Sequence, residues 1–380
     1  MRILTVLTSL GMGGAEKQAL AVAARMAGRG HAVAILSLMP RRNEEWPTKL
    51  PVVPLGIGKN PASLVPGLHR AWRFLREFRP DLLHSHSFHA NLFTRLLGIA
   101  APRAAVVSTV HNVYEGGWPR MMAYRLTDRW AECTVAVSQA AAERFIRLKA
   151  IPREKCAVRV NGIDTAEFAP DPERRAQMRR HLLGGEDGFF VWLAAGRIAP
   201  AKDYPNLLRA FDALHRQQNE ARLWIAGEGA AAAVAEIQAE ALRLGIQDSV
   251  RWLGLCREMP ALLDAADGFV LGSAWEGMPL VVGEAMAMEK PVVGTDVGGV
   301  RELVGAAGVL VPAKDAEALA AAMRTTMQRS GDARAQMGRA ARERIVQAFS
   351  IDAAADWWEA LYCRLRDPAT LKSSPRRRLP

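Results

Sequence analysis

The sequence has few of the residues that mark secreted, metal-binding or membrane-spanning proteins. Its four cysteines lie far apart, with neither a C-x-x-C pair nor a histidine spacing typical of a tetrahedral metal site. A reduced, cytoplasmic compartment is therefore expected. No apolar run approaches the roughly 18 residues of a membrane span, and the segment RILTVLTSL at the start is too short and too weakly charged for a signal peptide.

Motifs for divalent metals bound to diphosphates and for nucleic acids are also missing. The chain contains no D-x-D pair, which could hold Mg²⁺ or Mn²⁺ against a diphosphate, and no helix-turn-helix, zinc-finger or RNP-like pattern. The sequence thus predicts no metal, no cofactor and no nucleic-acid partner.

The first Gly-rich turn differs from a dinucleotide-binding fingerprint. Glu16 stands where that fingerprint needs Gly or Ala, and the second strand is followed by Arg41 and Arg42 instead of an acidic residue. NAD is therefore not expected, and the two arginines support NADP only weakly. The turn still offers backbone N–H groups at a helix N-terminus, which favours an anion site; a tight turn without a ligand is the open alternative.

Positive charge is concentrated in the first half of the chain. Residues 1–170 hold 23 Lys and Arg against 12 Asp and Glu, whereas residues 171–380 hold 27 of each kind. The first half is therefore expected to meet an anionic partner, such as a membrane surface or a phosphate-bearing substrate.

Short apolar runs alternate with helical patterns in two successive series. The first series opens with RILTVLTSL, a Gly-rich turn, a helical stretch and HAVAILSL, which together form a βαβ pattern. The second opens with FFVWLAAG, after a turn-rich stretch at 161–188 that predicts a linker and a short helix. Two tandem α/β domains with parallel sheets are expected.

Two glutamates, Glu276 and Glu284, lie among small and apolar residues directly after the predicted strand GFVLGS. Open α/β sheets bind ligands at the carboxyl ends of their strands, and Pro279 begins a helix whose N–H groups can face a phosphate. Carboxylates stacked on a phosphate would repel it, so the glutamates are expected to bind hydroxyls on either side. A nucleotide sugar, with a pyrophosphate between two sugars, has this shape.

Arg197 and Lys202 lie in one loop after the predicted strand FFVWLAAG, at the same edge of the sheet. Taken alone, such a loop is more often a solvated surface. Beside the glutamate motif it supplies the positive charge that a pyrophosphate needs when no metal site is present.

An ordered set of motifs carries a resemblance to a known enzyme family. The set comprises GGAE (13–16), HSH (84–86), TVHN (109–112), AVS (136–138), NGID (161–164), GRIAPAKD (196–203), the E-x7-E segment and TDVGG (295–299). The chain resembles a retaining glycosyltransferase of family GT4 over nearly all of residues 1–350. The resemblance implies the α/β GT-B fold, two tandem Rossmann-like domains facing a central cleft, and leaves the sugar, the base and the acceptor open.

The resemblance also implies a division of labour along the chain. Residues 1–168 would bind the acceptor and residues 169–350 the nucleotide sugar, with a helix at 351–366 crossing back to the first domain and a basic flexible tail at 367–380. The implied reaction is metal-independent transfer from a nucleotide-diphosphate sugar, expected to be UDP-linked. The implied acceptor is a saccharide or a lipid-linked molecule in cell-surface polysaccharide or glycolipid synthesis.

The residue roles implied by the resemblance follow the motifs. Arg197 and Lys202 would hold the diphosphate, Glu284 the ribose and Glu276 the transferred sugar. The implied catalytic residues are His111, Glu276, Arg197 and Lys202. The implied donor-binding residues are Gly13, Gly14, Arg197, Lys202, Leu255, Glu276, Gly277, Met278, Pro279, Leu280 and Glu284, and the acceptor-side candidates are Glu16 and His86.

The histidines near the HSH motif suggest a metal site, which we consider the weaker interpretation. On a strand only His84 and His86 share a face, His89 does not, and no carboxylate completes the set. A packed or acceptor-facing role is favoured for them. His111 ends a strand, and the resemblance places it near the reacting carbon, with a hydrogen-bonded edge histidine as the alternative.

The helical pattern at 68–80 has two interpretations. Leu68, Trp72, Leu75 and Phe78 mark one face, and Arg70, Arg73, Arg76 and Arg79 the rest. A helix that covers the sheet is the ordinary interpretation, and contact with an anionic membrane is the more specific one. Combined with a lipid-linked acceptor, the specific one predicts a cytoplasmic protein bound peripherally to the inner face of the cytoplasmic membrane.

Two other functions suit the same architecture. A nucleotide-sugar epimerase or hydrolase would need further acid/base residues in the first domain and no acceptor groove. A non-catalytic donor-binding subunit would be expected to lack one of Glu276, Arg197, Lys202 and His111, and the chain has all four.

Overall fold

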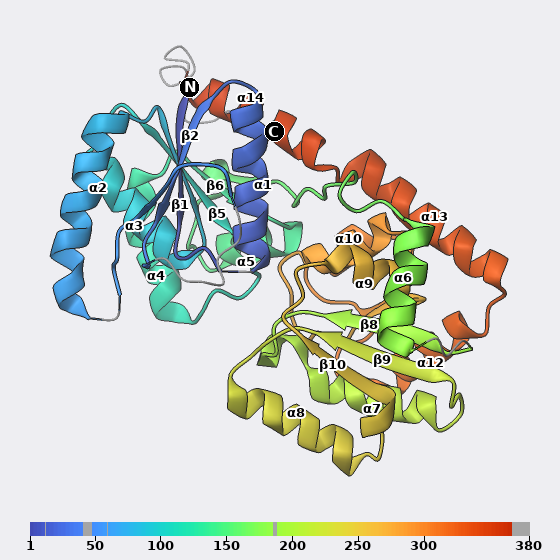
Figure 1. Cartoon of the computed structure of the whole chain (residues 1–380). Helices are drawn as coiled ribbons and strands as arrows, with labels where there is room; N and C mark the ends of the chain where they lie inside the picture. Colours follow the sequence, from blue (N-terminus) through green and yellow to red (C-terminus); the bar gives the residue numbers. More distant parts are fainter. Residues whose placement is uncertain (12, 41–47, 59, 185–187, 367–380) are drawn as a thin grey trace. The chain divides into compact units, whose positions relative to one another are not determined.

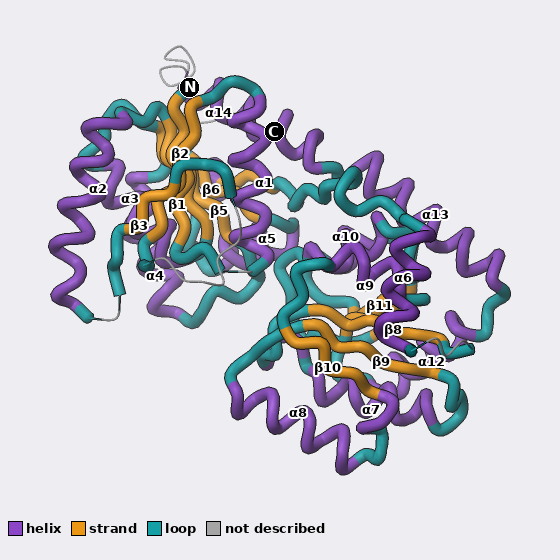
Figure 2. The backbone as a smooth tube through the Cα atoms, viewed as in Figure 1, coloured by secondary structure: helices purple, strands orange, loops and turns teal. Residues whose placement is uncertain are grey.

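The computed structural model describes residues 1–11, 13–40, 48–58, 60–184 and 188–366. The chain divides into two compact units: unit 1 is Met1–Gly162 together with the chain from Ile351 on, and unit 2 is Ile163–Ser350. Each unit contains one sheet with helices packed on it (Figures 1 and 2). The observed division lies six residues before the predicted one. The predicted tail at 367–380, as well as Arg41 and Arg42, lies outside the described residues.

Unit 1 contains a seven-stranded sheet in the order β3-β2-β1-β4-β5-β6-β7, and every strand pairing in it is parallel. The strands are β1 (Arg2–Leu7), β2 (Ala32–Ser37), β3 (Val52–Pro54), β4 (Leu82–His86), β5 (Ala105–Val110), β6 (Cys133–Ala136) and β7 (Cys156–Val158). The helices are α1 (Gly14–Gly28), α2 (Leu64–Phe78), α3 (Phe88–Gly98), α4 (Trp118–Thr127), α5 (Gln139–Arg147) and α14 (Ile351–Arg366).

The register of this sheet brings three motifs to one edge. Leu7 of β1 is level with His86 of β4, and His86 is level with Thr109 of β5. The Gly-rich turn follows β1, the HSH motif forms the last three residues of β4, and His111 directly follows β5. Because carboxyl ends of parallel strands share an edge, the three motifs are neighbours in unit 1.

Helix α14 packs on unit 1 although it follows unit 2 in sequence. Trp358 and Leu361 are buried in one core cluster with Ile3 of β1 and Val22 of α1. Arg29, the C-cap of α1, forms ion pairs with Asp356 and Glu359 of α14. Tyr362 of α14 is also fully buried.

Helix α2 corrects the predicted buried face of segment 68–80. The buried residues are Gly67, Ala71 and Leu75, whereas Leu68 and Trp72 are 43% and 45% exposed. A Cβ added to Gly67 would lie 2.4 Å from Ile57 Cγ1, so only small residues fit where the helix approaches this strand-flanking segment. The small residues therefore face inward, and the large apolar ones remain at the surface.

Unit 2 contains a six-stranded parallel sheet in the order β10-β9-β8-β11-β12-β13. The strands are β8 (Phe190–Ala195), β9 (Ala221–Ala226), β10 (Val250–Gly254), β11 (Gly268–Leu271), β12 (Val292–Thr295) and β13 (Val309–Val311). The helices are α6 (Pro172–Leu183), α7 (Tyr204–His215), α8 (Ala231–Arg243), α9 (Met259–Ala265), α10 (Leu280–Ala287), α11 (Val300–Val304), α12 (Ala316–Met327) and α13 (Gly331–Ala348). Strand order reverses between β8 and β11, which is the switch point where doubly wound sheets bind ligands.

Both units thus have the parallel sheet that the βαβ pattern predicts. The strands β3, β7 and β13 were not expected from the sequence, and each has only three residues. Such short strands carry no readable alternation of apolar and polar residues. None of the described helices is long and apolar enough to cross a membrane.

Candidate active site

The switch point of unit 2 brings Lys202 and Glu276 into contact. Lys202 ends a single 3-10 turn, η4 (Pro200–Lys202), after β8, and Glu276 follows the neighbouring strand β11. Lys202 Nζ lies 2.6 Å from Glu276 Oε1, and Ser273 Oγ donates to the same oxygen at 2.7 Å. The sequence predicts that these two side chains bind one ligand, and the structure places them side by side.

Glycine shapes the backbone that carries this lysine. Gly196 has a φ of +150°, and a Cβ added there would lie 2.7 Å from Lys202 Cε. A Cβ added to Gly227 would lie 2.0 Å from the Gly196 carbonyl oxygen. Tyr204 Oη donates to that same carbonyl at 2.8 Å. The end of β8 therefore needs glycine at both positions so that the loop can close over the strand and direct the lysine toward Glu276.

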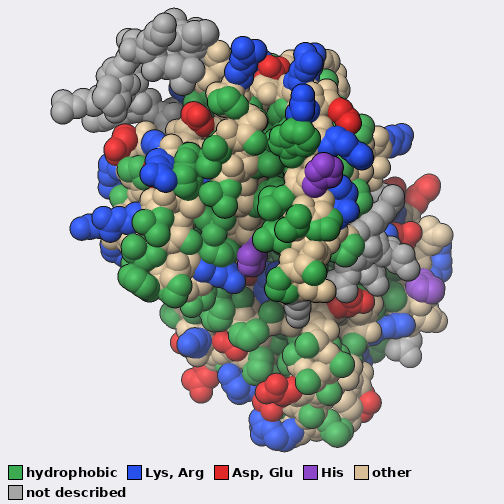
Figure 3. All heavy atoms as spheres, turned by 90° about the vertical axis from the view of Figure 1, so that its left-hand side faces the viewer, with side chains coloured by type: hydrophobic (Ala, Val, Ile, Leu, Met, Phe, Trp, Pro, Cys, Tyr) green, Lys and Arg blue, Asp and Glu red, His purple; other side chains and the backbone are tan. Residues whose placement is uncertain are grey.

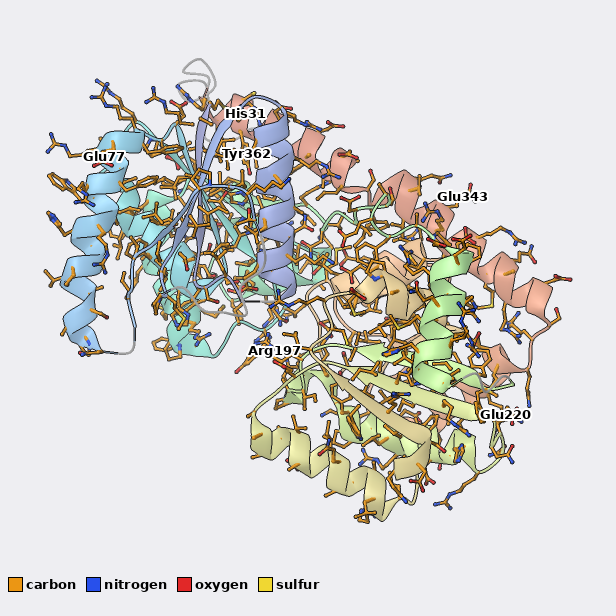
Figure 4. The ribbon with its side chains drawn as sticks, viewed as in Figure 1. His31, Glu77, Arg197, Glu220, Glu343 and Tyr362 are labelled. Atoms are coloured by element: carbon orange, nitrogen blue, oxygen red, sulfur yellow. The ribbon has the colours of Figure 1, made fainter. Side chains whose placement is uncertain are left out.

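Arg197 differs from Lys202 in its surroundings. Its side chain is exposed, and within the described residues it has no ion pair or hydrogen bond. Figure 4 shows it at the carboxyl end of β8. The same edge of the sheet thus carries two cations. Lys202 is partly buried and paired with Glu276, whereas Arg197 is exposed and available to a ligand.

Helix α10 presents its N-terminus at this same edge. Pro279 is the N-cap, with φ −75° and ψ 110°, and no side chain caps the helix. Gly277 accepts a backbone hydrogen bond from Gly299 at 2.8 Å, which ties the loop to the TDVGG segment. Glu284 lies in the second turn and is only 3% exposed. The uncapped N–H groups give this helix end a partial positive charge that suits a phosphate.

The remaining predicted donor residues of unit 2 follow β11 and β10, at the same edge of the sheet. Met278 and Leu280 flank the N-cap and are buried, and Leu255 lies partly buried in the bend after β10. Within unit 2, the structure therefore gathers the cations, the glutamates and the apolar residues at the carboxyl edge of one sheet.

In unit 1 the Gly-rich turn holds an acidic side chain of its own. Gly13 is the N-cap of α1, Gly14 is its first residue, and Glu16 lies in its first turn. A Cβ added to Gly13 would lie 2.4 Å from Glu16 Oε2, so the carboxylate folds back against the N-cap. The turn thus places an acidic side chain against the N-terminus of α1.

His86 and His111 form a hydrogen-bonded pair in unit 1. His86 Nδ1 lies 2.9 Å from His111 Nε2. Burial lowers the pKa of His111 to about 4, and that of His86 well below 6.5. Both rings are therefore neutral near pH 7, so neither acts there as a cation.

Glu115 and Tyr124 form hydrogen bonds that hold the His111 backbone, and neither residue was expected from the sequence. The N–H of His111 donates to Glu115 Oε1 at 3.0 Å, and Tyr124 Oη donates to Glu115 Oε2 at 2.7 Å. Burial raises the pKa of Glu115 despite these hydrogen bonds. Neither residue belongs to a recognised motif, so only the three-dimensional contact reveals them. Ser273 and Tyr204 of unit 2 were likewise overlooked, although Ser273 stands three residues before Glu276.

The histidines do not form a metal centre with acidic neighbours. Among the described residues, no group of three or more His, Cys, Asp or Glu is arranged to hold a metal ion. His84 instead packs on Trp358, with ring centroids 4.5 Å apart, and hydrogen bonds Thr109 and Tyr362.

Two family models match successive parts of the chain. Residues 12–167 match the family described as "Glycosyltransferase Family 4", and residues 190–329 match "Glycosyl transferases group 1". The first match lies almost wholly in unit 1 and the second in unit 2.

Two curated relatives have specific activities in their names. A UDP-Gal:alpha-D-GlcNAc-diphosphoundecaprenol alpha-1,3-galactosyltransferase of Escherichia coli is 26% identical over 60% of this chain and 61% of its own length. A GDP-mannose-dependent alpha-(1-6)-phosphatidylinositol monomannoside mannosyltransferase of Mycolicibacterium smegmatis is 32% identical over 60% of this chain and 63% of its own length. The chain thus matches less than two thirds of either protein.

Solved structures match the fold over almost the entire chain. Anabaena HepE in complex with UDP and glucose superposes with a TM-score of 0.84 at 21% identity, covering 96% of this chain and 99% of HepE. WaaG, described as a glycosyltransferase involved in lipopolysaccharide biosynthesis, superposes with a TM-score of 0.73 at 16% identity, covering 94% of this chain and 99% of WaaG. At these identities the likeness shows the fold alone.

Proposed function

The chain belongs to the GT4-like glycosyltransferases with the GT-B fold, and from this premise we propose its reaction. It transfers a sugar from a nucleotide-diphosphate sugar to a hydroxyl of a saccharide or lipid-linked acceptor, with retention at the anomeric carbon and without a metal ion. UDP is the proposed nucleotide, with GDP as the alternative, because the relatives' names include both. The product belongs to cell-surface polysaccharide or glycolipid synthesis.

The observation that carries this proposal is the Lys202–Glu276 pair beside Arg197 and the α10 N-terminus. A diphosphate arriving here meets two cations and free N–H groups. Lys202 then exchanges Glu276 for a phosphate oxygen, which frees the Glu276 carboxylate to accept from a sugar hydroxyl. Ser273 keeps Glu276 in place during this exchange because it donates to the same oxygen.

In the proposed chemical step, one bond to the anomeric carbon breaks and another forms. The bond from this carbon to the β-phosphate oxygen breaks, and a bond to the acceptor oxygen forms on the same face. The acceptor proton passes to the leaving phosphate. Arg197, Lys202 and the helix N-terminus stabilise the charge that develops on this phosphate as the sugar becomes oxocarbenium-like.

A donor panel tests the proposed function. The purified protein is incubated in EDTA with UDP-, GDP- and ADP-sugars, and a thermal shift identifies the bound donor. The identified donor is then assayed for nucleotide release with lipid-linked and free saccharide acceptors. Acceptor-dependent release in EDTA is expected. Release without any acceptor would indicate a hydrolase, and epimerised donor would indicate an epimerase. Donor binding with neither would indicate a non-catalytic subunit.

We further propose that α2 places the protein on an anionic membrane, at the cytoplasmic face. The exposed apolar side chains on α2 are Leu64, Val65, Leu68 and Trp72. Figure 3, which views the α2 side, shows hydrophobic and basic side chains mixed across this face. At the end of α2 a cavity of about 550 Å³ is lined by Trp72, Arg76, Arg79 and Arg103, among others. Apolar side chains beside cationic ones suit an anionic lipid surface.

The structure reduces the number of arginines in segment 68–80 that are available to contact a membrane. Arg70 donates to the Leu55 carbonyl, and Arg73 lies 3.8 Å from Glu77. The Arg76 guanidinium stacks over Trp72, 4.8 Å from the ring centroid, and therefore stays on the exposed face. Arg76 and Arg79, more than the other two, are proposed to meet the lipid headgroups.

Vesicle co-sedimentation tests the membrane contact. Phosphatidylglycerol vesicles should bind the wild type at low salt and release it at high salt, because charge attraction is screened. The double variant Trp72→Ser, Arg76→Ser should bind less, whereas Arg216→Ser should bind normally, because Arg216 is an exposed arginine at the C-cap of α7 in unit 2. No binding at low salt would overturn this proposal and leave the donor chemistry unaffected.

A further inference from the structure

Three histidine rings of unit 1 are linked in a fixed order. His84 Nε2 lies 2.7 Å from Thr109 Oγ1, and its Nδ1 lies 2.7 Å from Tyr362 Oη. The His86 ring packs on the His84 ring, with centroids 4.1 Å apart. His86 Nδ1 in turn lies 2.9 Å from His111 Nε2. A continuous series of contacts therefore runs from α14 through β4 to His111.

The hydrogen bond between His86 and His111 has a defined direction. Two neutral imidazoles share one proton in such a bond, so one ring donates and the other accepts. If His111 donated from Nε2, His86 would have to carry its own proton on Nε2. That atom is buried and has no hydrogen-bond partner among the described residues. A buried N–H without an acceptor is rarer and costlier than a buried lone pair without a donor.

We propose that His86 is a positioning residue that holds His111 in the tautomer protonated at Nδ1. His86 donates from Nδ1 to His111 Nε2, and His111 then offers its Nδ1–H to an oxygen of the reacting sugar. The inference rests on the proposed glycosyl transfer and on the place near the reacting carbon that the resemblance implies for His111. It makes His111 a hydrogen-bond donor and not a base, which agrees with transfer of the acceptor proton to the leaving phosphate.

Neighbouring side chains keep the His86 ring in the orientation that this role needs. His84 cannot turn freely, because Thr109 and Tyr362 hold its two nitrogens. Trp358 packs against His84 on another side, at a centroid distance of 4.5 Å. Tyr362, labelled in Figure 4, reaches this cluster from α14. The C-terminal helix thus contributes to the order of the His111 site.

Nitrogen NMR on protein labelled with ¹⁵N-histidine tests the tautomer directly. Protonated and unprotonated ring nitrogens have well-separated shifts, and loss of signals in His111→Ala assigns the His111 ring. The wild type should show His111 protonated at Nδ1. His86→Asn should keep this state because its amide donates from nearly the place of Nδ1, whereas His86→Leu should give a mixture. His89→Asn, a neighbouring histidine on α3, is the matched control and should leave the His111 signals unchanged.

Kinetics provide the second readout. His86→Leu should lower kcat about 10- to 100-fold, the usual effect of losing a side chain that orients a functional histidine, with the donor KM nearly unchanged. His86→Asn should restore most of the rate. His111 protonated at Nε2 in the wild type would overturn the inference, as would equal loss of kcat in the Leu and Asn variants.

The two assays separate this inference from the proposed function. If the wild type transfers no sugar, the proposed reaction fails, while the NMR spectrum still decides which tautomer His86 imposes. If His86→Leu does not fold, the wild-type spectrum and His86→Asn decide the matter.

Discussion

Both units bury polar groups at the carboxyl edge of a sheet, but these groups are uncharged in unit 1 and charged in unit 2. In unit 1 burial shifts the site toward uncharged forms: the pKa of His84 falls to about 3, that of His111 to about 4, and that of Glu115 rises. In unit 2 the site keeps charged groups together, with Lys202 and Glu276 2.6 Å apart.

This difference agrees with the ligand that the edge of each sheet is proposed to bind. A nucleotide diphosphate brings negative charge, which needs cations held ready but neutralised until it arrives. A sugar hydroxyl or an acceptor molecule is bound better by uncharged hydrogen-bonding groups, since these groups do not compete with the phosphate for its cations. The following predictions test this contrast.

The largest effect is expected from removing a cation of unit 2. Arg197→Ala and Lys202→Ala should each lower kcat/KM about 100-fold or more, because charge on the leaving phosphate loses a donor in a partly buried site. Steady-state kinetics with the identified donor measures this. Arg216→Ala, an exposed arginine on the same unit, serves as the control. Near-normal kcat/KM in both variants would remove the diphosphate assignment.

The two glutamates should differ in which kinetic constant changes. Glu284→Ala should mainly raise the donor KM, since a ribose contact is equally strong in the ground and transition states. Glu276→Ala should lower kcat about 10-fold or more if its sugar contact strengthens as charge develops. Identical behaviour with only KM changed would make Glu276 a binding residue alone.

The third effect concerns stability in mild acid. His84, His86 and His111 have pKa values lowered by burial, so below pH 6.5 the unfolded chain binds more protons than the folded one. Stability is therefore present above pH 6.5 and is lost as pH falls toward 4. Between pH 7.5 and 5.5 each such histidine should cost about 1 kcal/mol. The raised pKa of Glu115 acts in the opposite direction and offsets part of this loss.

Hydrogen exchange, corrected for the intrinsic rate at each pH, resolves the two units. Peptides from unit 1 should lose more protection at pH 5.5 than peptides from unit 2, where His215 has a lowered pKa and no comparable cluster of buried histidines occurs in the described part. Equal loss in both units would contradict the contrast between a neutral site and a charged one.

The sequence predicted those parts of the fold and site that rest on local patterns. The long buried strands and the switch-point loops follow from apolar runs and motif spacing, so Arg197, Lys202 and Glu276 could be expected at one edge. The individual role of each residue remains a prediction. The three-residue strands β3, β7 and β13 are set by pairing with longer neighbours and leave no local signal.

Other features depend on contacts that spacing does not encode. The prediction that Leu68 and Trp72 lie on the buried face of α2 was wrong, because the close packing at Gly67 leaves room only for small residues on that face. The hydrogen bond between Tyr362 and His84 joins residues 278 positions apart. Glu115 looks like a loop carboxylate in the sequence, and its role is visible only from the hydrogen bond that it accepts from the His111 N–H.

Calorimetric titration in EDTA tests the central claim that the edge of unit 2 binds a nucleoside diphosphate through its cations. UDP, GDP and ADP are compared with UMP, GMP and AMP on the wild type and on Arg197→Ala. One diphosphate should bind the wild type at least about 10-fold more tightly than its monophosphate, since the second phosphate gains a charge-assisted partner. The variant should lose most of that difference. Equal affinity for the diphosphate and the monophosphate in the wild type would contradict the account.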